Sequence, residues 1–216
     1  MILSRGRKYI FLHAPKTGGT SLTVALEARA KADDIIVSDT PKGRARAKRQ
    51  AKLPAKGRLW KHSTLADLEG LISQDELSQM FIVMMVRNPW ERVRSYYAWL
   101  QDQSFEHPAV TLAKTLSFDA FICHPMIAQS FRSNPYGNYV TDWTGREWPT
   151  HFIRLEHLDT DLTRFEQHLG VALPLGQHNE SGGAYKINAQ FTLFSACFWG
   201  LTCSKDISRF QYTFPK

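Results

Sequence analysis

The sequence is poor in cysteine, glycine and proline, and it lacks any long apolar run. Its 216 residues include 3 Cys, 13 Gly and 10 Pro, which excludes a disulfide-rich secreted domain and a collagen-like or low-complexity chain. No apolar stretch approaches the roughly 20 residues that a membrane-spanning helix needs. The cysteines form no CxxC pair. We therefore expect a cytoplasmic protein without a signal peptide, membrane anchor or structural zinc.

Acidic residues are the other shortage. Lys and Arg number 27 against 20 Asp and Glu, giving a net charge of +7, which favours anionic partners. Residues 40–66 contain no acid, and we expect a basic, mobile insertion at about 40–60 within a single domain spanning residues 1–216. A solvated loop is the first interpretation and steering of a polyanionic acceptor or doubly phosphorylated donor the second. Nucleic acid is disfavoured, because Trp60 is the only aromatic residue in the insertion.

Short apolar runs alternate with segments in which apolar residues recur at helical spacing. Such alternation predicts an α/β fold with a central, mainly parallel sheet flanked by helices. The run MFIVMMV at residues 80–86 has the continuous apolarity of a central parallel strand. The other predicted strands are 8–13, 35–37 and 151–155. The predicted helices are 22–29, 89–100, 118–123 and 158–169, with short helices between residues 65 and 79.

A glycine-containing loop, PKTGGTS, follows the first predicted strand. The two glycines let the backbone approach a ligand closely, and the amides at the start of the next helix form an anion site. An ordinary strand–helix turn with a surface lysine fits the same residues. The candidate anion-binding residues are Pro15, Lys16, Thr17, Gly18, Gly19, Thr20 and Ser21.

This loop is not a Walker A motif, in which lysine directly precedes the Ser/Thr at the helix start. Here Lys16 precedes the glycines. A nucleoside-triphosphate enzyme also needs an acid near a strand end to hold magnesium, but the strand at residues 80–86 leads to Arg87. The sequence thus predicts an anion neutralised by protein cations, with no metal. A variant-loop nucleotide kinase or NTPase, and a non-catalytic basic polyanion-binding protein, are the alternatives.

A second motif, RNPWERVRSYY, begins at the carboxyl end of the central strand, where α/β sheets bind ligands. Asn88 and Pro89 are typical of a helix start. Ser95 lies seven residues past Asn88, a rotation of roughly 700°, so both should project from one side of the helix. Arg87 and Ser95 together suit a terminal phosphate. Alternatively, Arg87 is an ion-pair residue and Ser95 a neutral surface position.

In these motifs the chain resembles the 3′-phosphoadenylyl sulfate (PAPS)-dependent sulfotransferases, in particular the carbohydrate and heparan-sulfate-type (sulfotransferase family 2-like) branch. The resemblance implies a P-loop-NTPase-like three-layer fold and metal-free, in-line sulfuryl transfer from PAPS to an acceptor hydroxyl, expected on a carbohydrate, with 3′,5′-ADP as product. Residues 15–21 would hold the 5′-phosphosulfate, and Arg87 with Ser95 the 3′-phosphate. The matching segments, in family order, are FLHAPKTGGTSL, VRNPWERVRSYY, FIRLEHLDTDL, QHNES and DISRFQYTF.

Such a transfer needs a cation at the leaving group and a base at the acceptor hydroxyl. Lys16 would stabilise the oxygen that bridges sulfur and phosphorus, assisted by loop amides and Thr17. The base candidate is His62 in WKHST, because the resembled branch has a histidine base in this region and a following helix start disfavours imidazolium. A helix-flanking surface histidine is the alternative. Glu91 is a weaker base candidate, and His13 is expected to be a packed strand-end residue.

The apolar stretch at residues 191–204 departs from the resembled pattern, so nucleotide contacts from the tail, Lys186 included, stay unassigned. Residues 105–148, rich in Tyr, Trp, Asn and Gln, would form the acceptor wall or core. Four further histidines lack the spacing of a metal site: His151, His157, His168 and His178.

Overall fold

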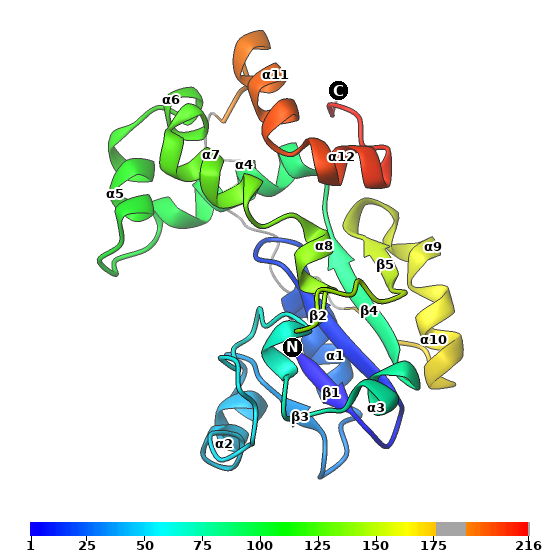
Figure 1. The fold of residues 1–216 in the computed structure, drawn as a ribbon. Helices are drawn as coiled ribbons and strands as arrows, with labels where there is room; N and C mark the ends of the chain where they lie inside the picture. The colour runs from blue at the N-terminus through cyan, green and yellow to red at the C-terminus, as the bar shows by residue number, and fades with distance from the viewer. Residues whose placement is uncertain (176–188, 216) are drawn as a thin grey trace. The chain divides into compact units, whose positions relative to one another are not determined.

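The computed structural model describes residues 1–175 and 189–215 (Figure 1). Within these ranges, no helix is long and apolar enough to cross a membrane. The contacts of the chain group into two compact units, and the expected single domain stays a prediction. The sheet unit comprises Met1–Val86 and Tyr136–His178, and the helical unit comprises Arg87–Pro135 and Asn179–Lys216.

The described strands are β1 (Ile2–Ser4), β2 (Tyr9–His13), β3 (Ile35–Ile36), β4 (Phe81–Val86) and β5 (His151–Arg154). They form one sheet in the order β3-β1-β2-β4-β5. β2 and β4 are parallel, with His13 opposite Met85, and β4 and β5 are also parallel. β1 is antiparallel to both its neighbours. The predicted α/β fold with a mainly parallel centre is confirmed, and the sequence missed β1 because three residues show no periodicity.

The helices of the sheet unit are α1 (Gly19–Glu27), α2 (Pro41–Gln50), α3 (Gln74–Ser78), α8 (Tyr136–Tyr139), α9 (Leu158–Asp161) and α10 (Thr163–Leu169), with 3-10 turns at Ala66–Leu68 and Leu155–His157. The predicted helix at residues 158–169 is interrupted at Leu162. Asp161 accepts hydrogen bonds from the Arg154 amide (3.0 Å) and guanidinium (2.8 and 2.9 Å). This ion pair ties the end of α9 to β5. Gly170, with φ 68°, ends α10 as predicted.

The central strands β2 and β4 are buried along nearly their whole length. Phe11 and Val83 pack with Leu22 of α1 and Phe165 of α10. Burial on both faces is what a continuous apolar run predicts. This core fixes the carboxyl end of β2, where the loop of residues 14–18 begins.

The basic segment at residues 40–60 contains the helix α2 rather than a loop alone. The Gln50 side chain donates to the carbonyl of Ile36 (2.8 Å) and accepts from its amide (2.6 Å). Arg46 donates to the main-chain carbonyl of Asp34 (2.6 Å). These bonds hold α2 against β3 and the residues before it, and the mobility of the insertion stays a prediction. The acceptors lie earlier in the chain, so the composition of the segment did not indicate them.

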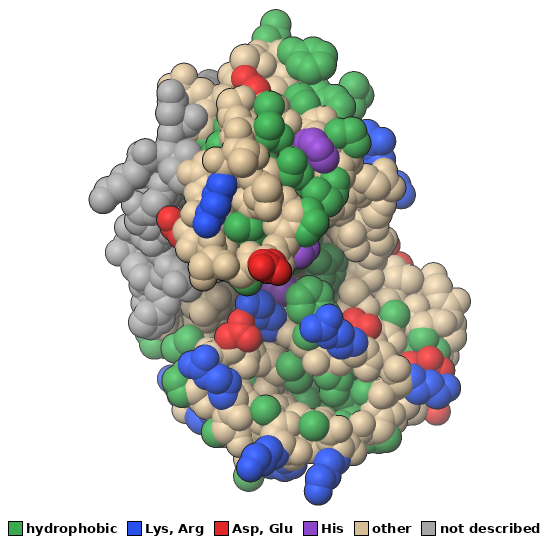
Figure 2. Space-filling view, turned by 90° about the vertical axis from the view of Figure 1, so that its left-hand side faces the viewer, with side chains coloured by type: hydrophobic (Ala, Val, Ile, Leu, Met, Phe, Trp, Pro, Cys, Tyr) green, Lys and Arg blue, Asp and Glu red, His purple; other side chains and the backbone are tan. Residues whose placement is uncertain are grey.

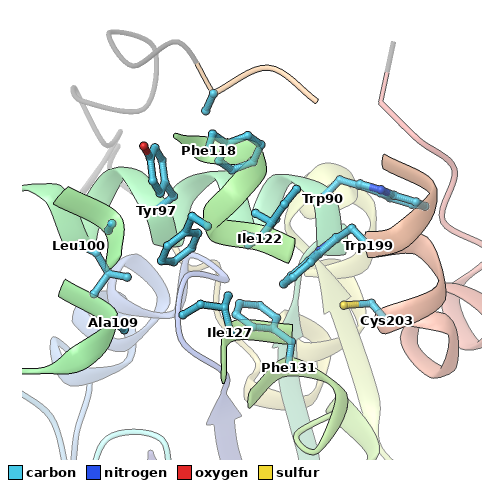
Figure 3. Close-up of a cluster of buried hydrophobic side chains, with 14 of the residues drawn as sticks. Trp90, Tyr97, Leu100, Ala109, Phe118, Ile122, Ile127, Phe131, Trp199 and Cys203 are labelled. Atoms are coloured by element: carbon cyan, nitrogen blue, oxygen red, sulfur yellow. The ribbon is translucent and has the colours of Figure 1, made fainter. Parts of the chain in front are cut away.

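The described helices of the helical unit are α4 (Pro89–Gln101), α5 (Pro108–Thr115), α6 (Phe118–Cys123), α7 (Pro125–Arg132), α11 (Leu193–Thr202) and α12 (Ser204–Phe210). Its core is a cluster of mainly aromatic and aliphatic side chains (Figure 3). The indole of Trp199 donates to the carbonyl of Pro89 (3.0 Å), and the indole of Trp90 donates to that of Ala196 (3.0 Å). These two bonds, with burial of both rings, hold α11 against the first turn of α4.

Candidate functional site

The loop after β2 contains two residues in the left-handed backbone region. Lys16 has φ 67° and Gly18 has φ 79°. A lysine adopts this conformation only where its surroundings enforce it. Thr17, which is fully buried, donates its hydroxyl to the carbonyl of Ala14 (2.8 Å) and so closes the turn. The expected assistance of Thr17 at a ligand would therefore come from its amide, because its hydroxyl hydrogen is already donated within the loop.

Both glycines of the loop are required by close neighbours. A Cβ at Gly18 would lie 2.8 Å from Cδ1 of Leu155. At Gly19 it would lie 2.3 Å from two ring carbons of His13, far inside van der Waals contact. The His13 ring thus packs directly on the first residue of α1. The glycines serve this packing as well as any approach of a ligand.

The start of α1 is electrostatically suited to an anion. Its cap, Gly18, makes no side-chain capping bond, and its first turn holds no acidic residue. A helix start carries partial positive charge. Lys16 and Ser21 are half-buried and Thr20 is exposed, so these three candidate side chains are accessible to solvent. Binding of an anion at this helix start stays a prediction.

His62 lies beside the strand end that begins this loop. Its Nδ1 is 3.0 Å from the main-chain oxygen of His13. A carbonyl oxygen only accepts, so this bond requires a hydrogen on Nδ1 of His62, and in the neutral form of the ring that tautomer has its lone pair on Nε2. The ring also stands edge-on to His13 (4.7 Å between centroids) and Trp60 (5.1 Å). His62 is therefore a half-buried imidazole whose ring is oriented by these contacts, and its role as a base stays a prediction.

The sequence predicted that a following helix start would disfavour the charged form of His62. The helical turn after His62 is only Ala66–Leu68, too short for the dipole effect invoked from the sequence. The orientation instead comes from the carbonyl of His13, and Ser63, which accepts from the amide of Trp60 (2.8 Å), shapes the loop around it. A main-chain acceptor 49 residues away leaves no signal in the sequence.

His13 itself is a packed strand-end residue, as expected. It is 5% exposed, and its Nδ1 has no hydrogen-bond partner among the described residues. Burial is the main cause that holds the pKa of His13 well below its ordinary value, and repulsion from the basic amino terminus, His62 and Lys61, whenever these groups are protonated, adds to it. His13 is therefore neutral and supports His62 without exchanging protons near neutral pH.

The second motif forms the predicted helix start in the helical unit. The Asn88 side chain accepts from the amide of Trp90 (3.1 Å), and Pro89 opens α4. Ser95 is 2% exposed, which excludes a neutral surface position. Arg87 pairs with Glu91 at 3.7 Å. An ion-pair role for Arg87 is thus present, and its phosphate role stays a prediction.

The same acid, Glu91, holds Arg94 more closely, at 2.7 Å. Because Glu91 forms ion pairs with both Arg87 and Arg94, we assign it a structural role in α4. Lys16 and His62 belong to the sheet unit, whereas Arg87 lies in the helical unit. That one ligand contacts all three residues therefore stays a prediction.

The remaining residues that the sequence suggested for the acceptor wall or the nucleotide site are either core residues or lie outside the described ranges. Trp148 is 6% exposed and donates to Asp142 (2.6 Å), and Tyr136 is fully buried, so these aromatics serve the core. The QHNES segment with His178, and Lys186, lie outside the described residues. No group of three or more His, Cys, Asp or Glu in residues 1–175 and 189–215 could hold a metal ion.

No family model and no curated protein matches the chain. Among solved structures, the chain is similar to mouse sulfotransferase SULT7A1 complexed with PAP, with 17% sequence identity and a TM-score of 0.40. The similarity covers 97% of this chain and 68% of that chain.

Proposed function

We propose that this protein is a sulfotransferase that moves a sulfuryl group from PAPS to an acceptor hydroxyl without a metal. The strongest support is that the candidate anion-binding loop and the candidate base, His62, both depend on the carboxyl end of β2. The carbonyl of His13 orients His62, and the next residues form the left-handed turn at Lys16. A leaving-group cation and a proton acceptor are the two groups that the reaction requires.

In the proposed reaction the acceptor oxygen attacks sulfur and forms a new S–O bond. The bond between sulfur and the bridging phosphate oxygen breaks, and its electron pair leaves with 3′,5′-ADP. His62 Nε2 takes the proton of the attacking hydroxyl. Lys16 and the amides at the start of α1 stabilise the charge that develops on the departing oxygen. Preorganisation of both groups by the strand end lowers the cost of orienting them during the reaction.

Arg87 and Ser95 would bind the 3′-phosphate of the same donor. Two features support this role. The Arg87 side chain is partly accessible, with 22% exposure, and its contact with Glu91 is long. A guanidinium in this position can offer paired donors to phosphate oxygens. A carbohydrate acceptor is implied by the sequence resemblance, and it belongs to the same proposal.

Transfer of radiolabelled sulfate from PAPS, in the presence of EDTA, tests the proposal. The acceptor panel should contain uronic-acid and hexosamine polysaccharides, simple glycosides and phenols, to separate carbohydrate from other hydroxyls. We expect EDTA-resistant transfer that falls steeply in His62→Gln and Lys16→Ala but not in the exposed controls His157→Ala and Lys56→Ala. Magnesium-dependent ATP turnover with no sulfate transfer would replace this function with a nucleotide kinase or NTPase.

A further inference from the structure

The helix α11 has one buried face and one exposed apolar face. Its sequence, LFSACFWGLT, contains no charged residue. Ser195, Trp199 and Thr202 point into the helical unit and are buried. The opposite side is the α11 stripe, in which apolar residues recur at helical spacing. The stripe consists of Leu193, Phe194, Cys197, Phe198 and Leu201.

The α11 stripe is unusually exposed. Leu193 is 84%, Phe194 72% and Leu201 75% exposed, and no other large hydrophobic side chain in the described ranges exceeds the 48% of Phe105. The rings of Phe194 and Phe198 stack at 6.3 Å, which makes the surface continuous. Figure 2 shows hydrophobic side chains gathered at the top of the view, at the height where Figure 1 draws α11. A contiguous apolar patch marks an interaction surface.

Two cations lie at the carboxyl-terminal end of the stripe. Leu201 lines a pocket of about 330 Å³ together with the exposed Arg132 and Lys205. Asp206 also lines the pocket, but it is only 4% exposed. The accessible charge at this end of the stripe is therefore positive, whereas the half-buried Asp119 lies at the other end, where it accepts from the amide of Thr192 (3.3 Å). An apolar helix face bordered by cations has the chemistry of a helix that lies in the interface of an anionic membrane.

We propose that the α11 stripe docks the protein on an anionic lipid surface. The leucine and phenylalanine side chains enter the acyl boundary, and Arg132 and Lys205 meet the lipid phosphates. The indole bonds of Trp199 and Trp90 hold the opposite face of α11 in the protein, so docking requires no unfolding of the helix. The proposal is independent of the chemistry at the loop after β2.

A second copy of the chain fits the stripe less well. A stable interface between proteins buries about 800 Å² per partner and uses roughly 20–30 residues a side, whereas the stripe supplies one face of a ten-residue helix. Two copies would also bring together chains that each carry +7. Charge and area both favour an anionic lipid surface.

Flotation of the full chain with lipid vesicles tests the proposal. We expect partition into vesicles of phosphatidylcholine with one quarter phosphatidylglycerol, and weaker partition into pure phosphatidylcholine. The double variant Phe194→Ser, Leu201→Ser should lower partition at least about tenfold, because it removes two large buried contacts with lipid. Phe105→Ser is the matched control in the same unit, and circular dichroism verifies that each variant folds.

Reversing the charge of one residue beside the stripe gives a second test of vesicle binding. Lys205→Glu should weaken binding to the anionic vesicles only, and added salt should reduce the difference between Lys205→Glu and the parent protein. Equal flotation of the parent and the double variant, or no flotation at all, would overturn the proposal. So would a dimer in sedimentation velocity that Phe194→Ser dissociates while vesicle binding is absent, since the occupant would then be a second copy.

Discussion

The sheet unit and the helical unit hold their candidate functional residues by different means. In the sheet unit, main-chain geometry dominates: Lys16 is held in a left-handed turn and His62 is oriented by the carbonyl of His13. In the helical unit, Arg87 lies just before the start of α4 and pairs with Glu91, and Ser95 lies two turns into the same helix, which aromatic packing buries. Under the proposed function, we expect the chemistry at the carboxyl end of β2 and a contribution to donor affinity from the side chains of the helical unit.

The substitution His62→Gln should produce the largest loss and would sharpen this comparison most. Removing a positioned general base costs typically 10²- to 10⁴-fold in rate, and glutamine keeps an amide that can still donate to the His13 carbonyl. Steady-state sulfate transfer measures kcat, and His157→Ala serves as the control histidine. A kcat within threefold of the parent value would remove His62 from the chemistry.

Lys16→Ala should come next, with a loss of about 10²- to 10³-fold in kcat, because it removes a donor at the developing charge of the leaving group. Binding of 3′,5′-ADP should weaken far less than the rate falls. Lys56→Ala, which removes an exposed lysine paired with Glu69, is the matched control. If affinity falls as much as kcat does, Lys16 serves ground-state binding and the proposed division between units fails.

Gly19→Ala tests the rigidity of the strand end through stability. The new methyl group would meet the buried His13 ring at 2.3 Å, and overpacking of this kind costs about 1–3 kcal/mol. Urea denaturation gives the change in the free energy of unfolding. Gly170→Ala is the contrast, because its Cβ meets nothing within 4 Å and only backbone strain opposes it. If Gly19→Ala left the free energy of unfolding unchanged, the carboxyl end of β2 would be able to shift and accommodate the added methyl group.

The smallest expected effect is a pH dependence from His13. Burial lowers its pKa in the folded state, so below about pH 6.5 the unfolded chain binds a proton that the folded chain does not. The free energy of unfolding should therefore fall as pH decreases below 6.5, by up to about 1.4 kcal/mol per pH unit from this group. Denaturation between pH 7.5 and 5.5 should show a shallower dependence in His13→Phe. Identical slopes would contradict a neutral, buried His13.

Local signals in the sequence predicted most of the elements that position the site. The apolar runs marked β2 and β4, and Asn88 with Pro89 marked the start of α4. The glycines marked the turn into α1. These features depend on neighbours in the chain, so a single sequence is enough to reveal them.

Features that depend on distant contacts escaped prediction. The bond from His62 to the carbonyl of His13 and the bonds between Gln50 and Ile36 join segments that are far apart in sequence. The sequence did not reveal which face of α11 is exposed, for a related reason. Its composition is apolar all round, and only the packing of Trp199 decides which face is buried.

Calorimetric titration in EDTA is the decisive measurement, because it shows whether the protein binds a bisphosphorylated adenosine without a metal. We predict that 3′,5′-ADP binds at least about tenfold more tightly than 5′-AMP, as expected for charge-assisted bonds to an additional phosphate. Arg87→Ala should erase most of that difference, and the exposed Arg132→Ala should preserve it. Equal affinities for the two nucleotides, or binding that requires magnesium, would contradict the account.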